Sequence, residues 1–389
     1  MDKTQKKLMS MGEPAMGSIY DEEELHAVQK VLENSIITFT GFRAATEVET
    51  FERLFSQYCD VQYATLLNGA GTAIDLALRC LNIEPGDEII SCAINFHGTH
   101  LSIINSGAKL VLCEPDPKTL NIGPYDVKKK LTPKTKAILV THMNGLPADT
   151  DLLNKIIDVS GIFTKESRPK IICDSARTLG TTYKNRVIGK NIWATIFSFQ
   201  SKKIITTLGE GGMIVTNDNK FDNQLKDFRT FGRGVNWGSN YKISKLQAAV
   251  GIIQLKKLKK LVEKRRKLAA YRNKELSIYS EITIQKDTEY AKNCYYLYTL
   301  ILPKNRNGEK RNKLMRVLSK KYGIGSVIAN PPTYQSNLYI SLHTSAKNLP
   351  MSEDLGERIL CLSLHPAMRD ETNRYIVDSF KLCYEKIFR

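Results

Sequence analysis

A carboxylate and an amine lie at the ends of two neighbouring apolar runs in the middle of this chain. Asp174 ends the run Ile171-Ile172-Cys173, and Lys203 lies 29 residues further on, just after the apolar run 193–199. Pyridoxal phosphate chemistry requires both groups, because a lysine amine forms the Schiff base and a carboxylate keeps the pyridine nitrogen protonated. Ligands of open α/β sheets bind at the carboxyl ends of the strands, where both side chains would lie. In a lysine-rich chain, the same pair also describes two solvated surface charges.

A glycine-rich turn offers a place for a phosphate group. Residues 68–73 (Asn-Gly-Ala-Gly-Thr-Ala) precede an amphipathic stretch at 74–78. Phosphates bind to backbone N–H groups at a helix N-terminus and to nearby hydroxyls, which Gly71 and Thr72 would supply. Ser198 would add a further hydroxyl. On its own, the segment equally describes a simple turn before a helix.

Together with other motifs, these residues follow an order that resembles one known family, the DegT/DnrJ/EryC1/StrS aminotransferases, over nearly the whole chain. The matching motifs are Gly71-Thr72, Phe96, His142-Met143-Asn144-Gly145, Asp174-Ser175-Ala176-Arg177, residues 198–203, Glu210-Gly211-Gly212 and Ser239-Asn240-Tyr241-Lys242. Seven motifs in the right order are far more specific than any one of them. The resemblance implies a pyridoxal phosphate enzyme of fold type I.

The resemblance also implies which residues act on the cofactor. The reactive lysine of the family lies five residues after the serine, which selects Lys203 over its rival Lys202. Its freed amine would act as the general base of the transfer. Asp174 is expected to pair with the pyridine nitrogen, although an aspartate there could also be a helix N-cap.

Further contacts to the cofactor are implied for aromatic and polar side chains. Phe96 is expected to stack on the pyridine ring, although a core phenylalanine would look the same in sequence. Gly71, Thr72 and Ser198 would bind the phosphate. Asn240 would reach the phosphate from a neighbouring subunit, so the resemblance implies a homodimer with shared active sites.

Two positions depart from the family pattern. Ala70 replaces the usual Ser or Asn before Gly71-Thr72, so one phosphate contact is expected to be missing. Arg177 replaces the usual His or Gln, and its guanidinium is expected to stabilise the ionised phenolic oxygen of the cofactor, unless it points away.

The implied reaction moves an amino group from glutamate or glutamine to a keto sugar, foremost one linked to a nucleoside diphosphate. The tripeptides Ser198-Phe199-Gln200 and Ser239-Asn240-Tyr241 also resemble members that act on keto-cyclitols such as scyllo-inosose. His142 and Lys202 are candidate substrate contacts, while a histidine that ends a buried strand is equally often structural. The keto position and the stereochemistry are not determined by these motifs.

The elements that must position these residues follow from short apolar runs alternating with helical patterns. The runs are 64–67, 88–90, 109–112, 137–140, 170–173, 194–197 and 212–216. This alternation of strand-like runs and helical segments predicts an α/β fold in a large domain, residues 1–250. Its sheet is expected to be mainly parallel and seven-stranded, with helices on its faces. A long basic helix at 248–276 leads into a smaller C-terminal α+β domain, residues 251–389. That domain is expected to contain a strand at 295–302, a loop at 331–346 and a helix at 374–388.

The composition limits the class of protein. The chain has 389 residues and a formal net charge of +17, which raises a DNA-binding regulator without enzymatic activity as an alternative. The leucines of the segment 255–268 recur with a helical period, however, and favour an amphipathic helix with a solvated basic face.

The eight cysteines include no Cys-x-x-Cys pair, so we expect neither metal nor disulfides in a cytoplasmic protein. No apolar stretch approaches the roughly 20 residues of a membrane span, and residues 1–7 show no secretory signal.

Overall fold

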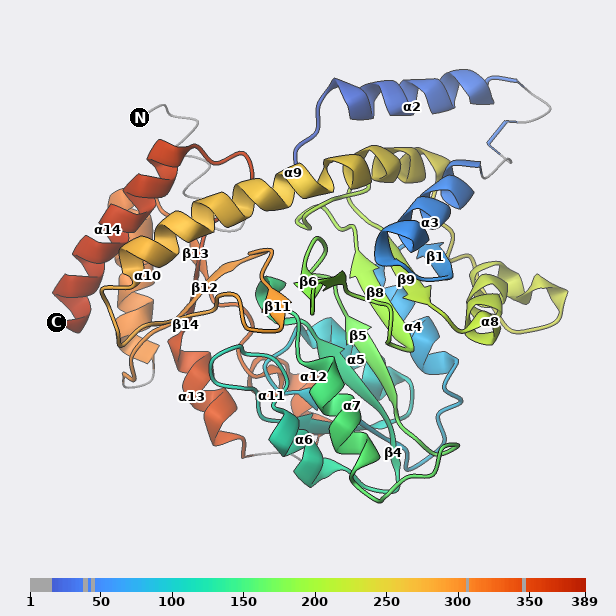
Figure 1. Ribbon diagram of the computed structural model, residues 1–389, viewed down its shortest axis with the longest axis horizontal. Coiled ribbons are helices and arrows are strands. Elements are labelled where there is room, and N and C mark those ends of the chain that lie inside the picture. The colour runs from blue at the N-terminus through green and yellow to red at the C-terminus, as the bar shows by residue number, and fades with distance from the viewer. Residues whose placement is uncertain (1–15, 38–40, 43–45, 306–307, 345–347) are drawn as a thin grey trace.

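The computed structural model describes residues 16–37, 41–42, 46–305, 308–344 and 348–389 (Figure 1). The segment 1–7, for which we predicted no secretory signal, lies outside the described residues. Within the described residues, no helix combines the length and the apolar character that crossing a membrane requires.

A seven-stranded sheet forms the centre of the large domain, as predicted. Its strands, in spatial order, are β1 (Tyr63–Leu67), β9 (Gly212–Thr216), β8 (Ala194–Ser198), β5 (Lys170–Asp174), β4 (Thr135–Thr141), β2 (Glu88–Cys92) and β3 (Lys109–Cys113). The five strands from β8 to β3 are parallel, whereas β9 runs antiparallel to both of its neighbours. All residues of β2, β8 and β9 are buried, which is why these runs are almost continuously apolar.

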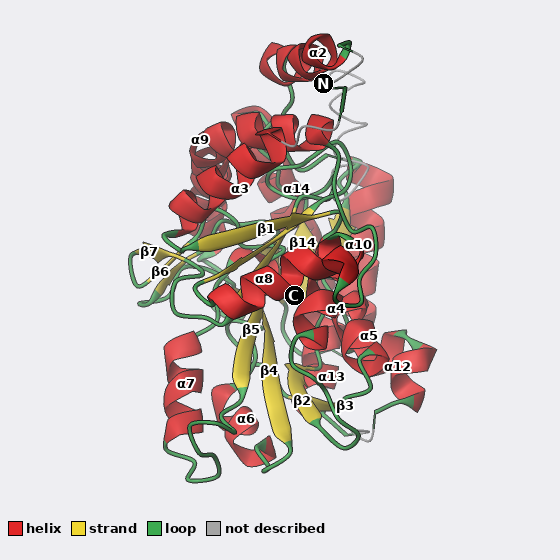
Figure 2. Ribbon diagram, turned by 90° about the vertical axis from the view of Figure 1, so that its right-hand side faces the viewer, coloured by secondary structure: helices red, strands yellow, loops and turns green. Residues whose placement is uncertain are grey.

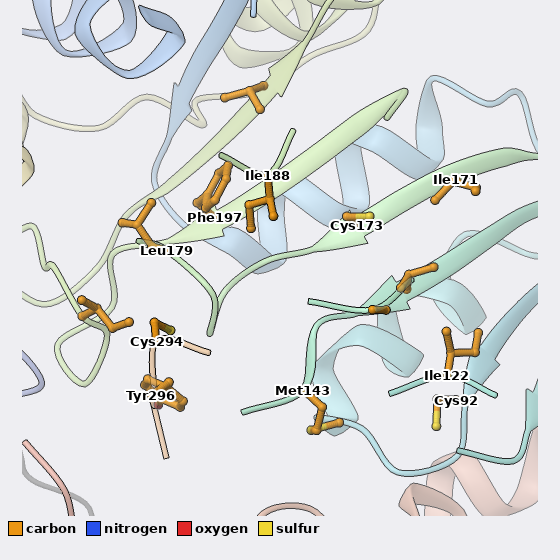
Figure 3. Close-up of a cluster of buried hydrophobic side chains, with 14 of the residues drawn as sticks. Cys92, Ile122, Met143, Ile171, Cys173, Leu179, Ile188, Phe197, Cys294 and Tyr296 are labelled. Carbon is orange, nitrogen blue, oxygen red and sulfur yellow. The ribbon is translucent and has the colours of Figure 1, made fainter. Parts of the chain in front are cut away.

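Successive strand residues alternate between two apolar cores, one on each face of the sheet. Cys173 faces the first core and Ile172 the second. Figure 3 shows the first core, into which Cys173 of β5 and Phe197 of β8 point together. Its helices are α3 (Thr46–Cys59), α6 (Pro124–Lys130), α7 (Thr150–Asp158) and α9 (Lys245–Leu276), and the second core is covered by α4 (Ala70–Arg79), α5 (His97–Asn105) and α8 (Asn219–Arg229).

Helix α9 spans the predicted domain boundary at residue 250 and confirms the predicted basic helix (Figure 1). It begins at a capping box in which the side chains of Ser244 and Gln247 bond each other's backbone N–H, which satisfies donors that the first turn leaves free. Helix α2 (Glu22–Ser35) packs against α9, and Lys257 binds Asp21 and Glu24 (Figure 2). The predicted solvated face is wrong at one position, because Arg265 is buried.

The smaller C-terminal region has a sheet and core of its own. The sheet has the order β10 (Thr283–Ile284), β12 (Tyr298–Ile301), β14 (Ile359–Leu362), β13 (Ser326–Val327), and α10 (Glu309–Tyr322), α13 (Pro350–Arg358) and α14 (Asp370–Phe388) surround it. The predicted strand and the predicted C-terminal helix are therefore present as β12 and α14. The short strands β6 (Thr182–Tyr183), β7 (Arg186–Val187) and β11 (Ala291–Lys292) form a third sheet.

The predicted loop at 331–346 is wrong in part, because it contains the helices α11 (Thr333–Ser336) and α12 (Leu338–Leu342). The Thr333 N–H donates to the carbonyl of Ala93, and the Asn337 side chain caps α12 by accepting from the Ile340 N–H. Ile340 is fully buried in the second core. This burial stabilises helices whose polar, proline-containing sequence is typical of a loop. Residues 345–346 of the predicted loop lie outside the described residues.

Candidate active site

A cavity of about 840 Å³ opens where β4, β5 and β8 end. Thr141, Asp174 and Ser198 are the last residues of these strands and line the cavity, together with Tyr296 and the segment 327–330 from the smaller region. Most of the predicted site residues line this cavity, namely Gly71, Thr72, Phe96, Asp174, Arg177, Ser198, Lys202 and Lys203. With Glu210, the structure therefore brings residues from five separate motifs to one space at the carboxyl edge of the sheet.

Asp174 is held in a fixed orientation at this cavity. Its side chain is only 4% exposed, and its two oxygens accept from the Thr99 hydroxyl at 2.9 Å and the Ala176 N–H at 3.0 Å. These two hydrogen bonds hold the side chain in one orientation. The group is thus placed to bind a cationic partner in the cavity.

Lys203 lies in the loop that follows β8. Its N–H donates to the Gln200 carbonyl at 2.8 Å, and the Ser201 N–H donates to the Gly209 carbonyl at 2.9 Å. These bonds fold the loop back onto itself. Lys203 Nζ lies 5.0 Å from the centroid of the Tyr296 ring, whereas Lys202 is exposed.

The glycine-rich turn leads into α4 with an open N-terminus. No side chain caps this helix, so the N–H groups of its first turn remain available to an anion. A Cβ on Gly212 would lie only 2.5 Å from the Gly69 carbonyl carbon. Strand β9 therefore packs directly against the turn, and this close approach explains the glycine at position 212.

Phe96 lies at the start of α5 and is 47% exposed, which leaves part of its ring available for stacking. A Cβ on Gly98 would approach the ring to 2.6 Å. The glycine thus leaves room for this ring position.

Residues 18–381 match the model of the DegT/DnrJ/EryC1/StrS aminotransferase family. The chain belongs to this family. The members of this family are pyridoxal phosphate-dependent aminotransferases, and membership favours an enzyme over the DNA-binding regulator considered from the charge.

Similar proteins cover nearly the whole chain. The spore coat polysaccharide biosynthesis protein SpsC of Bacillus subtilis is 29% identical, with 92% of this chain and 94% of SpsC aligned. The GDP-perosamine synthase of Escherichia coli O157:H7 is 28% identical, with 93% and 96% aligned. The structure of Spr1654 from Streptococcus pneumoniae in its PMP form has a TM-score of 0.88 at 26% identity and covers 96% of this chain and 98% of that chain. A PLP form of Spr1654 has a TM-score of 0.87.

The cavity of this aminotransferase fits pyridoxal phosphate in its donors and acceptors. The open N-terminus of α4 suits the phosphate, the buried Asp174 carboxylate suits the pyridine nitrogen and the Lys203 amine suits the aldehyde. The buried Thr141 hydroxyl, which faces Asp174 in the strand register, has no hydrogen-bond partner among the described residues. Such an orphaned hydroxyl indicates that a polar group belongs in this cavity.

Arg177 lines the cavity and links two segments that lie far apart in the chain. One of its nitrogens, Nη1, donates to Asn144 Oδ1 at 2.7 Å, and its guanidinium lies 5.8 Å from the Tyr296 ring centroid. In the orientation that satisfies its neighbours, the Asn330 amide oxygen accepts from Arg177 Nη2 at 2.8 Å and Nη1 at 3.0 Å. The cation is therefore fixed by neutral partners at the edge of the cofactor cavity.

Two predicted site residues lie elsewhere. His142 is buried beside a separate cavity under the β6–β7 hairpin, and its Nδ1 accepts from the Ala148 N–H at 3.0 Å. Burial lowers the pKa of His142 to about 4, so the ring is neutral and acts as a structural acceptor rather than lining the substrate cavity. Asn240 is exposed in another surface pocket, beside Phe42 and Lys242.

Sequence reasoning did not identify several residues of the cavity. Thr99 orients Asp174, Tyr296 faces Lys203 and Asn330 binds Arg177. Tyr296 and Asn330 come from the smaller region, more than 90 residues after Lys203 in the chain. They carry no motif of their own, so only their spatial position reveals them.

Proposed function

We propose that this enzyme transfers the amino group of glutamate or glutamine to the ketone of a sugar, foremost a keto-deoxysugar linked to a nucleoside diphosphate. The observation that carries this proposal is the joining of Lys203, Asp174 and the open α4 N-terminus in one cavity. By their names, one relative is a spore coat polysaccharide biosynthesis protein and another is a GDP-perosamine synthase. The net charge of +17 favours the approach of a diphosphate.

In this proposal, each residue of the cavity has a defined task. Asp174 holds the proton on the pyridine nitrogen, and Gly71, Thr72 and Ser198 hold the phosphate. When bound, the cofactor supplies an electron sink for the substrate carbon. Lys203 would hold the cofactor's aldehyde through its amine, and its Nζ, when free, would move a proton to and from that carbon as the general base. Phe96 and Tyr296 cover the cavity and exclude water from the reacting groups.

The substrate is tested by assaying glutamate and glutamine against a panel of nucleotide-linked keto sugars and inososes. We expect at least about 100-fold higher kcat/KM for a nucleotide-linked keto sugar than for scyllo-inosose, because a polar site discriminates strongly against substrates that leave its groups unpaired. A preference for the inosose would instead establish the keto-cyclitol alternative. Gln200 does not favour that alternative, because its side chain bonds Ser201 and the Lys202 N–H.

The proposed active assembly is a homodimer in which Asn240 binds the phosphate of the other subunit's cofactor. Asn240 lies outside the cavity of its own chain and is exposed. Large apolar side chains nearby are also exposed, with Phe42 at 56%, Phe231 at 62% and Trp237 at 49%. An exposed apolar surface of this kind is typical of an interface. The free cysteines support the predicted cytoplasmic location.

Arg177 is proposed to contact the phenolic oxygen of the cofactor. A cation there stabilises the ionised form of the phenolic oxygen and competes with the proton on the neighbouring nitrogen for that oxygen. The nitrogen therefore loses its proton at a lower pH. Replacing the cation by a neutral amide in Arg177→Gln should therefore raise the pH midpoint of the cofactor's absorbance band by about one unit. A pH titration of the purified holoenzyme measures this shift.

Arg168→Gln is the matched control, because it removes the same charge from a surface arginine that pairs with Asp158. An unchanged midpoint in Arg177→Gln would exclude the proposed contact. A raised KM for the sugar, without a shift of the midpoint, would instead place Arg177 at the substrate.

A further inference from the structure

Arg265 lies buried in the middle of the basic helix α9, with an exposure of 1%. Its Nη2 donates to the Gly17 carbonyl at 2.8 Å. Its Nη1 is shared by the carbonyls of Leu364 at 2.8 Å, Tyr296 at 3.2 Å and Tyr295 at 3.3 Å. One guanidinium thus connects helix α9 to three segments, namely the N-terminal segment, the residues just before β12 and the turn after β14.

The first of these segments packs against the loop that carries Lys203. The Gly17 N–H donates to the Ser201 carbonyl at 2.9 Å. A Cβ on Gly17 would lie 2.1 Å from the carbonyl oxygen of Lys202 and 2.4 Å from that of Lys203. The two backbones are in direct contact, so a displacement of Gly17 displaces the backbone of Lys203.

The second segment places an aromatic ring against the amine of the same lysine. The Tyr296 ring lines the cavity, and its centroid lies 5.0 Å from Lys203 Nζ. Arg265 holds the carbonyl of this same tyrosine. The guanidinium therefore bonds both to the segment that supports the Lys203 backbone and to the residue that faces the Lys203 side chain.

We propose that Arg265 is a positioning residue for Lys203, acting through Gly17 and Tyr296. The proposal rests on the assigned role of Lys203 as the lysine that binds the cofactor. A planar guanidinium has five donors in a rigid fork and can serve several carbonyls at fixed angles, whereas an ammonium has three donors on a flexible stem. Replacement by lysine therefore keeps the charge and loses the geometry.

The same helix provides a matched control two turns further on. Arg272 is also fully buried, and its guanidinium donates to Asn373 Oδ1 at 2.7 Å and to the Ser363 carbonyl at 2.8 Å. Neither acceptor lines the cavity. A substitution of Arg272 therefore perturbs an equally buried guanidinium without these contacts to the lysine loop and Tyr296.

The test compares holoenzymes carrying Arg265→Lys and Arg272→Lys by Tm, by kcat and KM, and by the pH midpoint of the cofactor's absorbance band. We expect both to lower the Tm, and only Arg265→Lys to reduce kcat about tenfold, or about 1.4 kcal/mol in the barrier. Its midpoint should fall by about half a unit, because a displaced Tyr296 ring stabilises the protonated nitrogen less. The charged groups that line the same cavity, Asp174, Arg177, Lys202 and Glu210, are unchanged in both variants.

Equal shifts of the midpoint and kcat in both variants, or no shift in Arg265→Lys, would overturn the proposal. The midpoint is measured without substrate, so this result is independent of whether the acceptor is a sugar. If Arg265→Lys does not fold, Gly17→Ala tests the same contact, since its Cβ displaces the lysine loop and alters no charge. We expect the same direction of change in kcat and midpoint, and an unaltered midpoint and kcat in Gly17→Ala would refute the positioning role.

Discussion

Lys203→Ala is expected to lower amino transfer by roughly 10⁴-fold or more, since it removes both the covalent attachment of the cofactor and the general base. Bound cofactor should then no longer be fixed to the protein by borohydride reduction. Mass spectrometry of the reduced, digested protein locates the label. In the unsubstituted enzyme, we expect the label on Lys203.

Lys202→Ala is the control, because it removes an amine from the adjacent position of the same loop. Lys202 is exposed, and its N–H bonds the Gln200 side chain, a bond that alanine retains. We expect this variant to keep the reducible link at Lys203 and to retain amino transfer, because the Lys203 amine is unchanged. A label on Lys202 would show that the motif register is wrong and that its neighbour has a different role.

The second large effect is expected from mixing two variant proteins that each have little or no activity. Asn240→Ala should lower kcat/KM by about 10- to 100-fold, because it removes a hydrogen bond to a charged phosphate. If Asn240 acts across the interface, a heterodimer of Lys203→Ala and Asn240→Ala protomers contains one intact site. In an equimolar mixture, random exchange of subunits makes half of the dimers mixed, and each mixed dimer has one intact site of two. The mixture should therefore regain about a quarter of the full activity.

The control mixes the double variant Lys203→Ala/Asn240→Ala with unsubstituted enzyme. Mixed dimers then contain no intact site if the sites are shared, and the activity falls to about a quarter rather than to half. No rescue in the first mixture, together with half activity in the second and proven subunit exchange, would show that each site is built from one chain.

Local patterns in the sequence predicted much of the scaffold. The alternation of short apolar runs with helical segments gave the large sheet, because strands buried on both faces need nearly continuous apolar sequence. The helical period of Leu258, Leu261 and Leu268 predicted the buried face of α9. These features depend on neighbours within one or two turns of the chain, so they can be derived without knowing the fold.

The motifs likewise predicted residues that line one cavity, since Lys203, Asp174 and the glycine-rich turn belong to continuous segments with defined spacing. Tyr296 and Asn330 were not found this way. They reach the cavity only because the smaller region packs against the end of the sheet, and a single tyrosine or asparagine carries no sequence signal for such a contact.

Burial of polar side chains was decided by the tertiary structure alone. Arg265 belongs to a run of lysines and arginines whose sequence predicts solvated side chains. Its guanidinium nevertheless donates hydrogen bonds to backbone carbonyls of three segments far apart in the chain. His142 belongs to a motif at the end of a strand, but its ring turns to the Ala148 N–H and away from the cofactor cavity. The sequence by itself predicted which groups would perform the chemistry and determined most of the elements that carry them. The tertiary structure decided which cations are buried and which residues surround the lysine, because those contacts form between segments far apart in the chain.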